Sequence, residues 1–248
     1  MAIHDTLRRG RNGPANPQRR PHRNPGLWER IWRQNSLSIV LLSLFALSWA
    51  GQMLAGFEHY VHELGQHGLP GIPFWSYLST GDFLEATAEN WESEFLQMSL
   101  YVVLTSFLRQ KGSAESKKLT GANEVDEDPH RHRNDPDAPS PVRKGGWRLA
   151  IYRNSLSLAL FTLFAAAFLL HAYGGAAANC EQNRMHKAEP CQTAWKFFAD
   201  AEFWSQSFQN WQSEFFSIAI LVVFSIYLRQ YGSPNSKPVH WPHSKTGG

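Results

Sequence analysis

Two glutamates stand in matching sequence contexts and are the residues whose positions point most directly to chemistry. Glu94 lies in the hexapeptide NWESEF, residues 90–95, and Glu214 lies in NWQSEF, residues 210–215. Each hexapeptide leads into an apolar run that ends in LRQ. A carboxylate beside such a run either complements the positive end of a helix or, inside a membrane, holds a proton or a cation.

The spacing along the expected helices places both glutamates at the outer edge of a bilayer. Glu94 and Glu214 each lie fifteen residues before the arginine of LRQ, which is about 22 Å of helix. Gln52 and His171 lie seventeen residues after the asparagine of two NSLS segments, or about 26 Å along their helices. We therefore expect Glu94 near Gln52 and Glu214 near His171, as a candidate proton or cation site.

A structural interpretation of the hexapeptides is favoured over this one. Asn90 and Asn210 would cap the start of a helix, and Trp91 and Trp211 would anchor it at the membrane interface. The glutamates would then complement the positive helix end, which contributes about 0.3–1 kcal/mol.

Cysteine and histidine suggest two further sites. Cys180 and Cys191 are the only cysteines and lie in one outer loop, so a disulfide is predicted in an oxidising compartment. It would stabilise the fold by about 3 kcal/mol. His59, His62 and His67 follow a weak metal-like spacing. Because the second copy carries nothing equivalent, we predict no metal, and a metal-binding or redox membrane protein that uses these histidines is kept as a third, lower-ranked alternative.

Known catalytic patterns give no support for an enzyme. The chain has no Gly-rich phosphate loop, no nucleophile elbow and no haem-attachment motif. No catalytic residue and no cofactor are predicted. The basic residues do not form a nucleic-acid-binding face, so no nucleic acid is expected as a partner.

Four apolar blocks must position these residues. Residues 36–56 and 155–174 contain no Asp, Glu, Lys or Arg and match the ~20 residues that a membrane-spanning helix needs. Residues 95–108 and 215–228 are shorter, with 14 residues each. We predict an all-α membrane protein with four transmembrane helices.

The distribution of basic residues gives the orientation. Lys and Arg number eight before the first block, none in the first outer loop, ten from Arg109 to Arg153, three in the second outer loop and three from Arg229 onward. This alternation places both termini in the cytoplasm.

The second half of the chain repeats the first. An offset of 119 aligns the NSLS segments, and an offset of 120 aligns Trp75 with Trp195 and NWESEF with NWQSEF. Each copy is a two-span hairpin, so the copies are parallel repeats in a pseudo-two-fold bundle. The expected parts are a disordered basic tail (1–27), a first repeat (28–110), a disordered cytoplasmic linker (111–146), a second repeat (147–233) and a C-terminal tail (234–248).

The paired NSLS, NWESEF…LRQ and NWQSEF…LRQ segments resemble a bacterial family of small integral membrane proteins known only as a domain of unknown function. The resemblance covers both hairpins and implies a multi-pass protein of the bacterial inner membrane, without any activity. We predict a structural or accessory membrane component, with a small transporter or proton- or cation-handling protein as the alternative. The expected partners are the lipid bilayer, anionic lipids at the N-terminal tail, and a second copy or another membrane protein.

Overall fold

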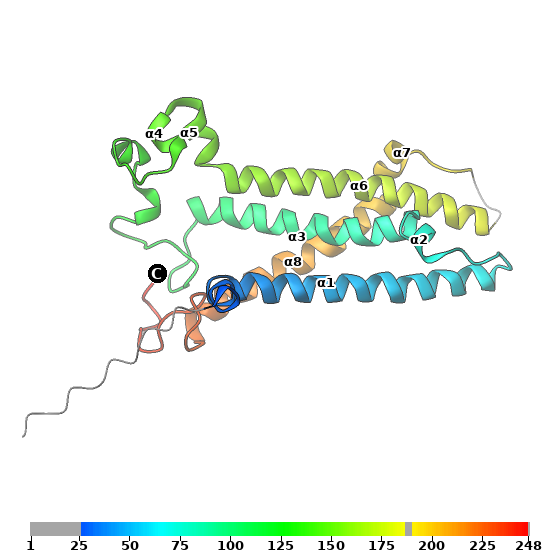
Figure 1. Ribbon diagram of the computed structural model, residues 1–248, viewed down its shortest axis with the longest axis horizontal. Helices are drawn as coiled ribbons and strands as arrows, with labels where there is room; N and C mark the ends of the chain where they lie inside the picture. Colours follow the sequence, from blue (N-terminus) through cyan, green and yellow to red (C-terminus); the bar gives the residue numbers. More distant parts are fainter. Residues whose placement is uncertain (1–25, 187–189, 248) are drawn as a thin grey trace, which may run out of the picture. The chain divides into compact units, whose positions relative to one another are not determined.

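The computed structural model describes residues 26–186 and 190–247, and every regular element in these residues is a helix (Figure 1). The chain divides into two compact units, residues 1–52 and 53–248. The predicted N-terminal tail lies outside the described residues except for its last two positions. The helices are α1 (Leu27–Gln66), α2 (Phe74–Tyr77), α3 (Gly81–Phe107), η1 (Glu124–Asp126), η2 (Pro129–His132), α4 (Ser140–Lys144), α5 (Gly146–Tyr152), α6 (Ser155–Met185), α7 (Ala194–Phe198) and α8 (Ala201–Tyr227).

The first unit contains most of α1, whose side chains are largely exposed. Leu37 is 72% exposed and Leu47 is 71% exposed. Two helices, α1 and α6, are long and apolar enough to cross a membrane by length and composition. This finding supports the predicted spans in residues 36–56 and 155–174.

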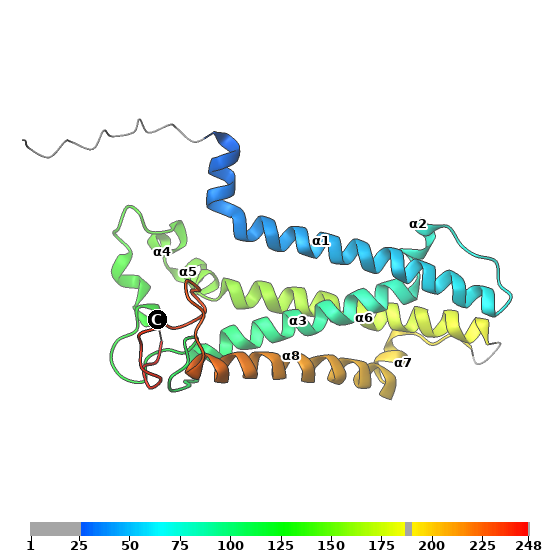
Figure 2. The same cartoon turned by 90° about the horizontal axis from the view of Figure 1, so that it is seen from below.

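In the second unit, α3 and α6 lie side by side along much of their length (Figures 1 and 2). Small residues allow the close approach. A Cβ atom added to Gly174 of α6 would lie 2.6 Å from the backbone nitrogen of Glu85 in α3. A Cβ atom added to Gly81 of α3 would clash with the backbone at Ala177 and Ala178. Backbone approach at small residues is the usual way in which membrane helices pack tightly.

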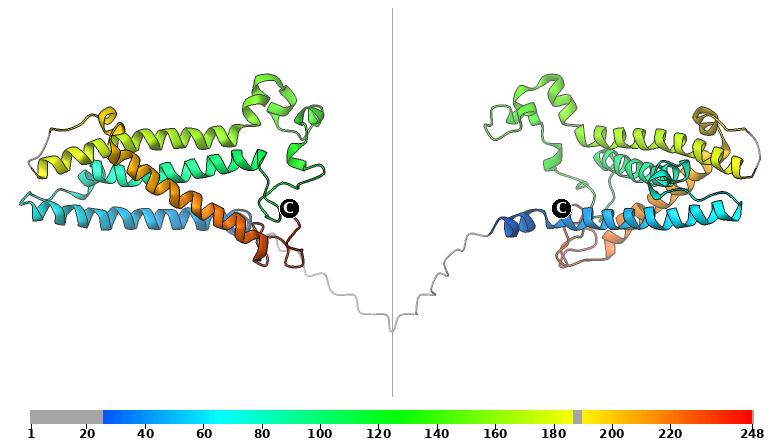
Figure 3. Two further views of the ribbon diagram at one scale, coloured as in Figure 1. Left: turned by 180° about the vertical axis from the view of Figure 1, so that it is seen from behind. Right: turned by 45° about the vertical axis from the view of Figure 1, so that its right-hand side comes forward.

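The helix α8 packs against α3, and the short helix α7, which precedes α8, packs against the middle of α6 near Gly175 (Figure 3). A small apolar core lies at this junction. It contains Ala172 and Ala176 of α6, Phe197 of α7 and Phe203 of α8. Phe197 and Phe203 are fully buried, so aromatic packing holds α7 and α8 against the middle of α6.

The starts of α3 and α8 differ from the expected ones. Thr80 caps α3 by accepting a hydrogen bond from the backbone N–H of Phe83, 3.4 Å away, and Asp200 caps α8 through Glu202. Asn90 and Asn210 therefore lie inside the helices rather than at their starts. The polar segments before the apolar runs are helical because α2 and α7 end in turns that supply these caps.

The linker and the C-terminal tail have defined local structure in the described residues. The linker carries η1, η2 and α4, and its predicted flexibility in solution stays a prediction. The LRQ segments lead into two similar loops. In one, the Gln110 N–H donates to Ser116 Oγ at 2.9 Å, and in the other the Gln230 N–H donates to Ser236 Oγ at 2.9 Å.

Candidate functional site

A buried ion pair lies between α3 and α6. His171 Nδ1 of α6 is 2.7 Å from Glu92 Oε2 of α3, and both residues are 0% exposed. The imidazole also packs on the Phe203 ring of α8, with ring centroids 4.6 Å apart. A carboxylate and an imidazole so fully removed from water require partners for every polar atom.

Each remaining polar atom of the pair has a partner from α8. Trp211 Nε1 donates to Glu92 Oε1 at 2.9 Å, and His171 Nε2 lies 3.1 Å from Gln206 Oε1. Both ring nitrogens of His171 thus face oxygen acceptors. A histidine that donates from both nitrogens is the positively charged imidazolium, so the pair is a charged one in this arrangement.

Gln206 connects the pair to a second carboxylate. Its amide Nε2 donates to Glu85 Oε1 of α3 at 2.9 Å. Glu85 is half-buried, and burial raises its pKa to about 7, although the hydrogen bond from Gln206 and the charge of His171 oppose the shift. Glu85 thus lies at the more accessible end of a chain of four side chains, Glu92, His171, Gln206 and Glu85.

Helical periodicity explains why these residues meet. Glu85 and Glu92 are seven residues apart on α3, so they lie on one face of that helix. Gly174 and Gly175, one turn beyond His171, lack side chains that would hold α3 and α7 away. The network forms because the small-residue face of α6 lets the acidic face of α3 approach.

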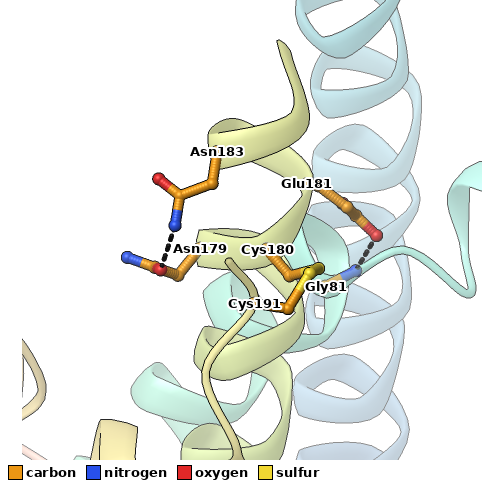
Figure 4. Close-up of a disulfide and its surroundings, with 6 residues drawn as sticks. All are labelled: Gly81, Asn179, Cys180, Glu181, Asn183 and Cys191. Carbon is orange, nitrogen blue, oxygen red and sulfur yellow. Dashed lines mark hydrogen bonds between the residues drawn. A yellow bond between two sulfur atoms is a disulfide. The ribbon is translucent and has the colours of Figure 1, made fainter. Parts of the chain in front are cut away.

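A second polar cluster lies toward the C-terminal end of α6 (Figure 4). Glu181 Oε1 accepts a hydrogen bond from the backbone N–H of Gly81 at 3.0 Å, and its Oε2 accepts one from Tyr60 at 3.2 Å. Cys180 and Cys191 lie beside it at disulfide distance, with Cα atoms 4.5 Å apart. The pair joins the end of α6 to the segment that leads into α7.

The glutamates singled out in the sequence lie elsewhere. Glu94 is exposed and Glu214 is half-buried, and burial together with the neighbouring Glu94 carboxylate raises the pKa of Glu214. The carboxylate that pairs with His171 is Glu92, not Glu214. Gln52 belongs to the first unit.

The three histidines weighed as metal ligands lie in or just after α1. His67 approaches the ring of His186 at 4.6 Å between centroids, and its Nδ1 faces the backbone oxygen of Glu63. Among residues 26–186 and 190–247, no three His, Cys, Asp or Glu side chains gather closely enough to hold a metal ion.

Sequence reasoning missed Glu92, Gln206 and Glu85. The seven-residue spacing of Glu85 and Glu92 was the available signal for a polar face on α3. The partner face on α6 carries glycines and alanines around a single histidine, which is a pattern of close packing. Taken together, the two faces would have pointed to His171 and Glu92.

A protein-family model matches residues 28–248 of the chain. The chain belongs to the family described as Domain of unknown function (DUF6766). DUF6766 covers all the helices of the described residues apart from the first residue of α1. Comparison with curated proteins and with solved structures finds no match. The predicted membership of a family of unknown function is confirmed, and DUF6766 brings no activity to the buried network.

Proposed function

We propose that this protein is a four-span membrane protein that binds and exchanges a proton at the His171–Glu92 pair. The proposed spans lie in α1, α3, α6 and α8, with both termini in the cytoplasm. The resemblance noted from the sequence favours a bacterial inner membrane. Large apolar side chains on these helices support membrane insertion, among them Leu169 of α6 at 61% exposed and Phe216 of α8 at 67% exposed, since soluble monomers rarely expose extended apolar surface.

The buried ion pair is the observation that carries the proton function. Replacing a buried ion pair with apolar residues is often neutral or stabilising, so stability alone gives little reason to keep His171 and Glu92. His171 lies in the predicted span 155–174, where an ionisable residue is costly and commonly marks a proton or ion site. A purely accessory role, which the sequence favoured, leaves this charged pair without a purpose.

Gln206 gives the site two hydrogen-bonding arrangements with the same net charge. In the arrangement described above, Nε2 of His171 donates to Gln206 Oε1, and Gln206 donates to an ionised Glu85. In the other, the amide is turned by half a revolution: a protonated Glu85 donates to Gln206 Oε1, and Gln206 Nε2 donates to a neutral His171. In this transfer Gln206 Oε1 accepts the proton of His171 Nε2 while Gln206 Nε2 gives one of its protons to Glu85. Return of the resulting imidic acid to the amide form, with rotation of the group, completes the exchange, and Glu92 stays ionised.

This exchange connects the buried pair to the half-buried carboxyl. The pKa of Glu85, about 7, allows that carboxyl to take up or release a proton near neutral pH. The charged groups that act on Glu85 are His171, Glu89 and Glu202. Glu85 is thus the proposed point of proton exchange with water.

The repeat supplies a neutral counterpart in the sequence. At the offsets of 119 and 120, the positions that correspond to His171 and Glu92 are Gln52 and Gln212. In the sequence, both ionisable residues therefore correspond to amides in the other repeat. This asymmetry supports a proton-specific role for His171 and Glu92, because an amide pair can make hydrogen bonds but holds no mobile proton.

The double variant Glu92→Gln with His171→Gln copies these amides into the charged centre. After reconstitution of the full chain into vesicles, decay of an imposed pH gradient should be slowed roughly a hundredfold, as for loss of a proton-transfer group. Glu94→Gln changes the exposed glutamate two residues away and should leave the decay unchanged.

A second readout separates proton binding from transport. In ¹⁵N NMR spectra of the folded protein at low pH, both ring nitrogens of His171 should carry protons. If His171 is the imidazolium but the pH gradient decays as fast with the double variant as with the wild-type protein, the pair is structural. If His171 stays neutral throughout, the proton site is rejected.

A further inference from the structure

A hollow with a cationic rim lies where the linker meets α6. It has a volume of about 470 Å³ and is formed by α4, α5 and the first residue of α6, Ser155. Its chemistry comes from two cations and from apolar or aromatic side chains, namely Lys144, Arg148, Pro141, Trp147, Ile151 and Tyr152.

The hollow combines exposed apolar surface with exposed positive charge. Trp147 is 70% exposed and Ile151 is 51% exposed, so apolar surface is open beside the cations. Lys144 and Arg148 are exposed, and no acidic residue lines the hollow. The lining is complementary to a molecule that carries a negative charge next to a hydrocarbon portion.

The position of the hollow indicates that such a molecule would come from the membrane. Ser155 begins α6, one of the two helices that can cross a membrane. A hollow at the first residue of a span lies at the depth of lipid headgroups, where Trp and Tyr are enriched and where cations near the surface attract anionic lipids.

We propose that this hollow binds an anionic phospholipid, with Lys144 and Arg148 at the phosphate and Trp147 and Ile151 against the upper acyl chain. The site requires membrane insertion of α6, but it does not depend on the proton chemistry of His171. It is also separate from the predicted lipid contact of the N-terminal tail, since it lies in α4 and α5.

The first repeat lacks the same charge pattern. The offset of 119 aligns Trp147 with Trp28 and Arg148 with Glu29. Glu29 lies 4.0 Å from Arg33 in an exposed ion pair. An acidic residue where the second repeat has a cation disfavours an anionic ligand, so the proposed site is specific to the second repeat.

The test measures lipid retention by the full chain. Protein is reconstituted in vesicles of phosphatidylcholine mixed with phosphatidylglycerol, extracted in detergent, and the bound lipid is counted by native mass spectrometry. Wild-type protein should retain phosphatidylglycerol selectively. Lys144→Gln with Arg148→Gln should weaken retention about thirty-fold, from the attraction of two cations near an anionic surface.

Matched variants and a competitor make the result decisive. Lys118→Gln with Arg131→Gln removes the same charge from exposed linker positions and should retain the lipid. Ile151→Ser should weaken lipid retention without affecting any binding of inorganic phosphate. Equal loss in both double variants, equal retention of the two lipids, or displacement of the lipid by inorganic phosphate alone would overturn the proposal. Failure of every variant and the wild type to enter vesicles would instead reject membrane insertion.

Discussion

The pair His171–Glu92 makes a quantitative prediction about how two buried charges contribute to stability. At an effective dielectric constant of ~20, two unit charges at the 2.7 Å distance of this pair attract by about 6 kcal/mol. Removing both groups from water costs several kcal/mol each, so the pair as a whole contributes little net free energy. Each partner alone, however, would be a buried and uncompensated charge.

We therefore expect strong non-additivity in a double-mutant cycle. His171→Leu and Glu92→Leu should each lower the free energy of unfolding by about 3–5 kcal/mol. The double variant removes both charges and leaves the Trp211 N–H and Gln206 Oε1 without their partners, at about 1–3 kcal/mol for each group. With the middle of each range, the coupling energy should be about 4 kcal/mol.

The cycle is measured by reversible SDS titration of the full chain in mixed micelles, followed by tryptophan fluorescence and circular dichroism. Glu94→Leu is the matched control, because Glu94 is exposed on the same helix and should change stability by less than about 0.5 kcal/mol. If the two single effects add to within about 0.5 kcal/mol, the charged pair is refuted.

Three further predictions concern neighbouring features. Glu85→Gln should flatten the pH dependence of stability. Because the raised pKa means that folded Glu85 holds its proton more tightly, its contribution to stability is full below pH 4.5 and is lost as the pH rises through about 7. Thermal unfolding across this pH range checks it, and an unchanged slope in the variant contradicts it. Cys180→Ala with Cys191→Ala should cost about 3 kcal/mol, and dithiothreitol should then have no further effect; an equally stable variant would mean that the two thiols are not joined. Gly174→Val should force α3 and α6 apart, because the new Cβ would lie 2.6 Å from the Glu85 nitrogen, and Gly65→Ala, where a Cβ meets open space, is its control in the same unfolding assay.

The sequence by itself determined the long apolar helices and the cysteine pair. Residues 36–56 and 155–174 contain no Asp, Glu, Lys or Arg, and a helix satisfies its own backbone hydrogen bonds, in water or in a membrane. Cys180 and Cys191 are the only cysteines of the chain, so no other intrachain pairing was available. These features depend on local composition, so they can be predicted directly from the sequence.

Only the tertiary structure decided which carboxylate meets the histidine. Glu92 and Glu94 are two residues apart in the same hexapeptide, and two residues on a helix point to nearly opposite sides. Depth along the helix, which the sequence gives, is nearly the same for both. The side that faces α6 is set by the contact of Gly81 with Ala178 and of Gly174 with Glu85. That packing buries Glu92 against His171 and leaves Glu94 exposed, because rotation of a helix about its axis is fixed by its neighbours.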